Sequence, residues 1–138
     1  MPTNRGDELL IALRTRLVSV ASLPAVRVWQ NTNAGVPSPT VASVEDRLIT
    51  FDTTRREVGP TAGGRTTVTY RVTLRVPKGT DTHAALAIAV AIQDAFTGAT
   101  LTVGGNLVLL EDSRVGPEIT DTQFLTLPIY LSLTFDHT

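Results

Sequence analysis

Two stretches that alternate apolar and polar residues constrain the fold more than any other feature of the chain. In the stretch from Thr66 to Val76, one face is apolar or aromatic: Val68, Tyr70, Val72, Leu74 and Val76. In the stretch from Thr122 to Phe135, alternate positions are again apolar: Leu125, Leu127, Ile129, Leu131, Leu133 and Phe135. A period of two is typical of a strand with one buried face. The sequence therefore predicts a sheet with one apolar and one polar face.

Two other stretches have helical periodicity. The first, Asp7 to Val20, has leucines at a spacing of three and four, and acidic residues at its start suit the helix dipole. The second begins with a cap at Thr80, Asp81 or Thr82 and runs to about Thr97. Its apolar arc is about twice the roughly 100° stripe of a surface helix. Because one sheet would cover only part of that arc, we expect the rest to contact a second partner, with Leu86 and Ile88 as candidate interface residues.

Shorter or less regular strands are predicted at Val26–Trp29, 40–52 and 101–110, the last interrupted at Gly104–Asn106. The residues from Thr53 to Gly64 are polar and rich in glycine, so they predict a long mobile connection between strands. Glu111, Asp112 and Ser113 are expected to lead into a loop. Pro128 has no N–H, so the last strand is expected to lie at a sheet edge there.

The predicted order is helix, two or three strands, helix and two strands, with neither an internal repeat nor a linker. This order favours an α+β fold: a mostly antiparallel β-sheet with two α-helices packed on one face. The 138 residues are the length of one domain, so we expect residues 1–138 to form a single domain.

Composition and motifs exclude several function classes. The chain has no cysteine, which rules out disulfides and thiolate chemistry, and its net charge of −1 argues against a general nucleic-acid binder. No apolar stretch approaches the length of a membrane span. The sequence has neither a nucleophile elbow nor a phosphate-binding loop, and its two histidines suggest no metal pair. We predict no catalytic residue, metal or cofactor, and find no set of polar residues for a small-molecule or enzymatic site.

Arginines form the one biased cluster of charge. Five of them lie in the predicted connection and on the polar face of the strand that follows: Arg55, Arg56, Arg65, Arg71 and Arg75. Three interpretations remain open: a solvated face, a contact surface for another protein, and a weaker case for nucleic acid. A complementary acidic patch on a neighbour is predicted at Glu111, Asp112, Glu118 and Asp121.

Trp29 is the only tryptophan, and it ends a short strand just before a loop rich in asparagine and proline. It is a candidate anchor of the core or, alternatively, of an interface, where tryptophan often contributes most of the binding energy.

The order of these motifs resembles that of the tail terminator, or tail-completion, proteins of long-tailed bacteriophages and gene transfer agents. The resemblance is carried by an N-terminal helix, Val26-x-Val28-Trp29-x-Asn31, a loop ending in Pro39 and the strand 70–76 followed by Pro77-x-Gly79. It continues through an alanine-rich helix ending near Phe96, the segment 115–119 and the closing strand with Leu127-Pro128-Ile129. The match extends from about Asp7 to Phe135.

This resemblance implies a structural virion protein that is not an enzyme. It implies a homohexameric ring on the head-proximal end of the tail tube, at the tail–neck junction, assembled in the host cytoplasm. The ring would stop tube polymerisation and contact the tail tube protein and the head connector, with DNA passing through its lumen. The alternative is a head-completion, or neck, protein of the same virion. We expect the connection 53–64 to face the tube or a neighbouring subunit.

Overall fold

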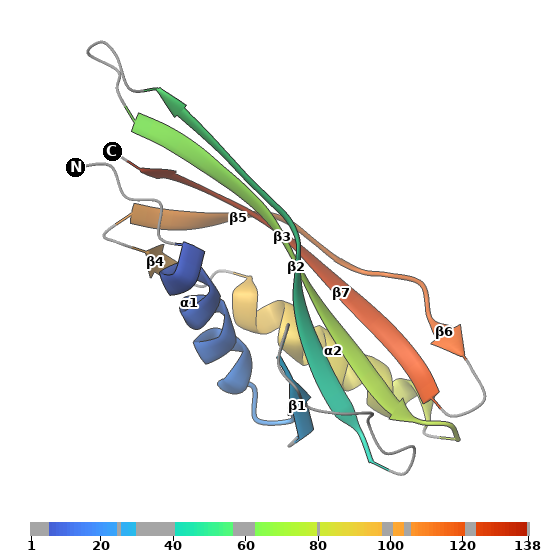
Figure 1. Cartoon of the computed structure of the whole chain (residues 1–138). Helices are drawn as coiled ribbons and strands as arrows, with labels where there is room; N and C mark the ends of the chain where they lie inside the picture. Colours follow the sequence, from blue (N-terminus) through green and yellow to red (C-terminus); the bar gives the residue numbers. More distant parts are fainter. Residues whose placement is uncertain are drawn as a thin grey trace.

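The computed structural model describes residues 6–24, 26–29, 41–56, 63–79, 81–97, 101–103, 106–120 and 124–137. Their elements are α1 (Gly6–Val18), β1 (Val26–Val28), β2 (Ser43–Arg56), β3 (Gly63–Pro77), α2 (Thr82–Phe96), β4 (Leu101–Val103), β5 (Asn106–Val115), β6 (Ile119–Thr120) and β7 (Phe124–His137). Within these ranges seven strands form one sheet in the order β1-β2-β3-β7-β5-β4, and β6 pairs with β7. Both helices lie on one side of it (Figure 1). The predicted α+β class is confirmed.

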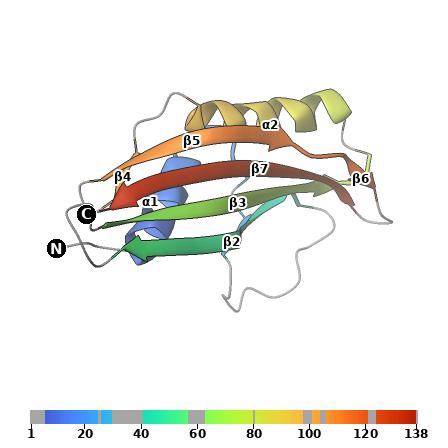
Figure 2. The same ribbon diagram turned by 90° about the horizontal axis from the view of Figure 1, so that it is seen from above.

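The strands β3 and β7 form the centre of the sheet, and their alternation is confirmed. They pair antiparallel along almost their whole length, from Gly64 opposite His137 to Pro77 opposite Phe124. Figure 2 shows β2, β3, β7 and β5 side by side. The apolar face of β3 is almost completely buried from Val68 to Val76, as is that of β7 from Leu125 to Leu133. Burial of these side chains between sheet and helices supplies the main driving force for folding.

The helix α1 is anchored by three leucines one turn apart. Leu9, Leu13 and Leu17 have no exposed surface, whereas Leu10 is half-buried. The helix ends at Val18, two residues earlier than predicted, because the chain tightens into i→i−3 hydrogen bonds there.

The helix α2 begins with the predicted type of cap. Asp81 is the capping residue, and its carboxylate accepts a hydrogen bond from the His83 backbone N–H at 3.1 Å. The buried face consists of Ala85, Ala89, Ile92 and Phe96. The two alanines have no side-chain bulk beyond Cβ, so the helix axis can lie close to β5 and β7, which it contacts.

The predicted connection from Thr53 to Gly64 is wrong at both of its ends. The strand β2 continues to Arg56, and Arg55 and Arg56 pair with Gly64 and Gly63 of β3. Threonine favours strands, and β7 extends as far as His137 beside β3, so the ladder continues beyond the apolar stretch. Residues 57–62 lie outside the described ranges.

The predicted loop after Leu110 is also wrong. The strand β5 continues through Glu111 and Asp112 to Val115, with an irregularity between Leu110 and Asp112 that accommodates one extra residue. This is the pattern of a β-bulge, which lets a strand continue past a break in its alternation. The short strand β6 was not predicted.

Pro128 does not lie on an edge strand, because β7 is flanked by β3 on one side and by β5 and β6 on the other. The missing N–H is nevertheless accommodated locally. Pairing with β5 ends at Ile129 and pairing with β6 begins at Thr126, so Pro128 falls between the two partners. Its carbonyl accepts the Gly116 N–H at 2.7 Å. The proline therefore lies at an interruption of the ladder inside a central strand.

Candidate functional site

The face of the sheet opposite the helices has no other described element over it (Figure 1). The polar residues of β3 lie on this face, as their alternation predicted, and they include Arg71, Thr73 and Arg75. Thr73 is buried, whereas both arginines are half-buried. We call this surface the open face.

Strand register places three arginines and one tyrosine in a single row across the open face. Arg47 of β2 lies opposite Arg71 of β3, and Arg71 lies opposite Tyr130 of β7. Arg114 of β5 lies opposite Tyr130 from the other side, with its guanidinium carbon 4.7 Å from the ring centroid. We call Arg47, Arg71, Tyr130 and Arg114 the arginine row. Its positive charges lie on neighbouring strands, where like charges directly opposite one another are unfavourable.

Arg75 is neutralised within the subunit and Arg71 is not. Arg75 Nη1 donates a hydrogen bond to Glu45 Oε2 at 2.5 Å, and both side chains are about one quarter exposed. The Arg71 Nε group is buried and has no hydrogen-bond acceptor. A buried donor without an acceptor is rare in native proteins and calls for an explanation.

The five predicted arginines do not form one cluster. Arg71 and Arg75 lie near the middle of the open face, where Arg47 and Arg114 join them. Arg65 is exposed six residues earlier on β3, opposite Thr54, and Arg55 and Arg56 are at the end of β2. The side chains of Arg55 and Arg56 lie outside the described part of the chain. Arg47 and Arg114 were missed because only the strand register brings them beside Arg71.

The predicted acidic residues that the structure describes are exposed, and Asp112 lies opposite Ser132 of β7, on the same face of the sheet as Arg114. Glu111 and Asp112 are both exposed on β5, and Glu118 is exposed just before β6. No ion pair joins any of the three to another described residue. Asp121 lies outside the described ranges. The exposed carboxylates are available to a partner, and their role as the patch that meets a neighbour's arginines stays a prediction.

The outer side of α2 remains partly apolar. Leu86 is 40% exposed and Val90 is 45% exposed, whereas Ile88 is half-buried and packs against the core. The two candidate interface residues on this helix therefore differ. Leu86 is on the outer surface, and Ile88 belongs to the subunit's own packing.

Trp29 follows β1 and is half-buried against the core, so it has features of both predicted roles. The Arg14 guanidinium lies 5.1 Å from its ring centroid, in a cation–π arrangement. A pocket of about 340 Å³ on the outer side of α1 is lined by Ile11, Arg14, Thr15, Val18 and Trp29. Ile11 is 63% exposed, so this pocket has an apolar rim.

Behind Trp29 lies a buried charged cluster that the sequence did not reveal. Arg14 Nε donates to Asp46 Oδ2 at 2.7 Å, and the Tyr70 hydroxyl donates to the same oxygen at 2.8 Å. Asp46 and Tyr70 have no exposed surface. Burial, together with the adjacent Asp46 carboxylate, raises the pKa of Tyr70 well above its usual range. The cluster fastens α1 to β2.

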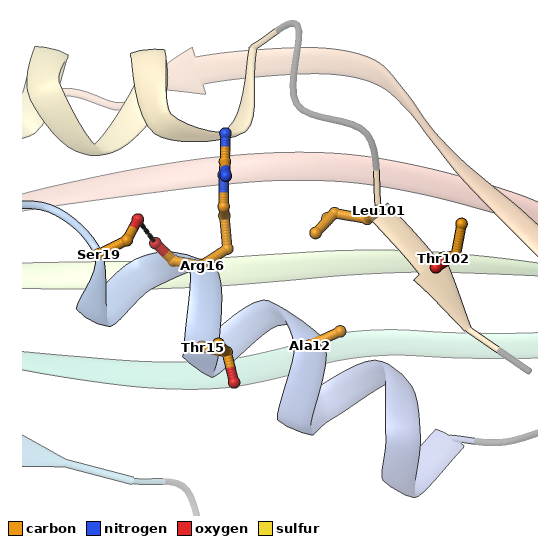
Figure 3. Close-up of a pocket in the computed structure, with 6 residues that line it drawn as sticks. All are labelled: Ala12, Thr15, Arg16, Ser19, Leu101 and Thr102. Carbon is orange, nitrogen blue, oxygen red and sulfur yellow. Dashed lines mark hydrogen bonds between the residues drawn. The ribbon is translucent and has the colours of Figure 1, made fainter.

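A second pocket, of about 380 Å³, lies between α1 and β4 and is drawn in Figure 3. Its lining residues are Ala12, Thr15, Arg16, Ser19, Leu101 and Thr102. Arg16 extends from α1 toward α2, and its Nε donates to the Ala95 carbonyl at 2.6 Å. A cation near the last carbonyls of a helix is favourable, so Arg16 joins the two helices.

Among the described residues there is no group of three or more His, Cys, Asp or Glu that could hold a metal ion. No described helix is long and apolar enough to cross a membrane. In the described ranges, large apolar side chains such as Ile11, Leu86 and Val90 are exposed, and Arg71 Nε is buried without a hydrogen-bond partner. The surfaces of this chain are therefore its candidate functional features.

The same fold occurs in solved structures of low sequence identity. A chain with no functional name superimposes with a TM-score of 0.63 at 21% identity, covering 99% of this chain and 97% of that one. A chain of the virion of a native gene transfer agent particle superimposes with a TM-score of 0.56 at 18% identity, covering 95% of each. Comparison with curated proteins gives no significant match. The fold is thus one that is found in a virion protein.

A family model described as phage tail terminator protein matches residues 8–133. The match covers most of the 138-residue chain, from within α1 to within β7. The protein belongs to the phage tail terminator family and is a structural component of a virion tail.

Proposed function

We propose that this protein closes the head-proximal end of the tail tube as a homohexameric ring. The ring ends polymerisation of the tube protein and presents the surface to which the head connector binds, and DNA passes through its lumen. The observation that carries this proposal is the family match over residues 8–133. We propose that the ring lies at the tail–neck junction, where the tail tube protein and the head connector are its partners.

The described surfaces are compatible with a ring. A ring is built from heterologous contacts, so each subunit needs two different patches that fit one another. The chain offers an apolar patch at Leu86 and Val90 on α2 and, on a different side, the exposed charges of Arg47 and Arg114. The exposed carboxylates of Glu111 and Asp112 supply opposite charge.

The ends of β2 and β3 lead into residues 57–62. We propose that this connection contacts the tail tube or a neighbouring subunit, as the glycine-rich sequence suggested. We also treat residues 1–138 as one domain, because the described elements share one hydrophobic core.

Deletion of the gene and electron microscopy of the resulting particles test the function. A terminator deletion should give overlong tails, or tails not joined to heads. Normal tails beside leaking heads would instead identify a head-completion protein. Wild-type protein supplied in trans should restore joined particles of normal tail length. Arg27→Gln supplied in trans should restore them equally well, since Arg27 is an exposed arginine of β1 away from the open face.

Native mass spectrometry tests the ring. A species of six subunits that grows with protein concentration is the expected result. A different closed stoichiometry would contradict the hexamer while leaving the terminator function in place.

A further inference from the structure

A small pocket opens on the open face of the sheet, and the arginine row borders it. Its volume is about 210 Å³, and it is lined by Arg71, Thr73, Arg75, Ile119, Thr126, Pro128 and Tyr130. Arg71 lies in the row itself, between Arg47 on β2 and Tyr130 on β7. The pocket is distinct from the two beside α1.

The Arg71 guanidinium lacks a hydrogen-bond acceptor for one of its N–H groups. Its Nε is buried without a hydrogen-bond partner. Desolvating a charged donor without giving it an acceptor costs free energy, so such a group is expected to find an acceptor in the functional state.

Among the residues that the structure describes, no carboxylate pairs with Arg71. Along β3, Arg75 has Glu45 of β2 as its ion-pair partner. The residue of β2 directly opposite Arg71 is Arg47, which has the same charge. The next arginine of the row, Arg114, is stacked on Tyr130 and adds further positive charge. Glu45 shows how a carboxylate pairs with an arginine on this face, whereas no described residue accepts a hydrogen bond from Arg71 Nε.

We propose that this pocket binds a carboxylate side chain from an acidic segment of another protein, with Arg71 as the central contact. A guanidinium presents N–H groups in a fork that matches a carboxylate, and Arg47 lies close enough in the row to share the negative charge. The hydroxyls of Thr73 and Thr126 line the pocket as further donors. Pro128 and Ile119, the latter 57% exposed, form an apolar wall for the methylene groups of a glutamate.

The charge and aromatic content of the protein favour a protein ligand over a nucleic acid. The chain has a net charge of −1 and a pI of about 6.1, so its overall field does not attract a polyanion. Single-stranded nucleic acid is usually held by several stacking aromatics, whereas this pocket has Tyr130, and Arg114 already covers part of that ring. The inference goes beyond the proposed ring, since it concerns a binding site of the single subunit.

The test is the binding of a fluorescein-labelled peptide of alternating glutamate and serine, followed by fluorescence anisotropy at low salt. The wild-type protein should bind it saturably, and the peptide with glutamine in place of glutamate should bind at least about tenfold more weakly. Arg71→Gln should weaken binding of the glutamate peptide by about tenfold or more. Arg71→Lys keeps the charge but lacks the fork, so it should restore only part of the affinity. Arg27→Gln, which removes an exposed charge on β1, should bind like the wild type.

Equal binding of the glutamate and glutamine peptides, or unchanged binding by Arg71→Gln, would overturn the inference. Tighter binding of a 15-nucleotide single-stranded DNA, lost in Arg71→Gln, would give the pocket to phosphate and overturn it too. If the wild type alone self-associates and Arg71→Gln abolishes this, a second copy supplies the carboxylate and the assignment to another protein is wrong. Circular dichroism checks that each variant is folded. The gene-deletion phenotype is independent of all these results, so failure of the pocket and failure of the terminator function are distinguishable.

Discussion

Arg14 of α1 and Asp46 of β2 form an ion pair across 32 residues of sequence, with 2.7 Å between Nε and Oδ2. The Asp46 side chain has no exposed surface, and the Arg14 side chain is 25% exposed. The Tyr70 hydroxyl donates a second hydrogen bond to the same carboxylate. The buried Asp46 carboxylate is stabilised by both donors. Because one of them, Arg14, belongs to α1, the ion pair fixes the position of α1 on the sheet.

Removing Arg14 should be more harmful than neutralising Asp46. In Arg14→Met the buried carboxylate loses its counter-charge, and we expect a loss of about 3–5 kcal/mol in the free energy of unfolding. In Asp46→Asn the remaining charge is that of Arg14, which is 25% exposed, and the Tyr70 hydrogen bond is retained, so the loss should be about 1–2 kcal/mol. Urea unfolding measures both, with Arg27→Met as a control expected within about 0.5 kcal/mol of wild type. An Arg14→Met protein as stable as the control would contradict the role given to the pair.

The raised pKa of Tyr70 predicts that the protein loses stability at alkaline pH. Its pKa is raised in the folded state by burial and by Asp46, whereas an unfolded tyrosine ionises near pH 10. Below about pH 10 both states hold the proton and the group has no effect on the pH dependence. Above it the unfolded state loses the proton first, so the free energy of unfolding should fall by about 1.4 kcal/mol per pH unit.

Urea unfolding at a series of pH values checks this dependence. Tyr70→Phe should be less stable at neutral pH by about 1–2 kcal/mol, because Asp46 loses a donor, and its alkaline decline should be flatter. The half-buried Tyr130 provides the matched variant Tyr130→Phe, which should keep the decline. An unchanged decline in Tyr70→Phe would show that another group is responsible.

Leu86 and Ile88 should respond differently to the same substitution. Leu86→Asp places a charge on the outer side of α2 and should change stability by about 1 kcal/mol or less. Ile88→Asp places a charge against the core and should cost about 2–4 kcal/mol. Thermal unfolding followed by circular dichroism measures this. In the ring proposal, Leu86→Asp should stay folded but fail to assemble by native mass spectrometry, so a variant that assembles normally would exclude Leu86 from the interface.

Gly116 should not tolerate a side chain. A Cβ there would lie 2.9 Å from Pro128 Cγ and 2.9 Å from Tyr130 Cε2. Gly116→Ala should therefore lower the free energy of unfolding by about 1–3 kcal/mol. Adding Pro128→Ala removes one of the two collisions and should recover part of the loss. Gly79→Asn is a useful comparison, because Gly79 has a φ of +96° in open space and asparagine tolerates that conformation. A fully stable Gly116→Ala protein would contradict this prediction and show that Pro128 and Tyr130 of β7 can move away from the added Cβ.

Much of the fold could be predicted because its signals are local. The alternation in β3 and β7 and the apolar spacing in α1 and α2 identified the elements and their buried faces. The errors lie where a neighbouring strand decides the outcome. Thr53 to Arg56 and Glu111 to Val115 look polar and loop-like by themselves, yet they pair with β3 and β7 respectively.

The candidate site was predicted less well than the fold. Arg71 and Arg75 were identified from the polar face of one strand, but the prediction joined them to Arg55 and Arg56 and missed Arg47 and Arg114. No partner was predicted for Glu45 or Asp46. In the structure Glu45 pairs with Arg75, and Asp46 is fully buried.

The sequence by itself determined the class of the fold and the apolar faces of β3 and β7, because the periods of two and of 3.6 residues follow from backbone geometry alone. Only the tertiary structure decided which charged groups meet. The register of β2, β3, β7 and β5, shifted at Ile49 and Glu111, brings Arg47, Arg71 and Arg114 into one row. The docking of α1 on β2 brings Arg14 to Asp46. Register and docking depend on residues far apart in the chain, so no local pattern encodes them.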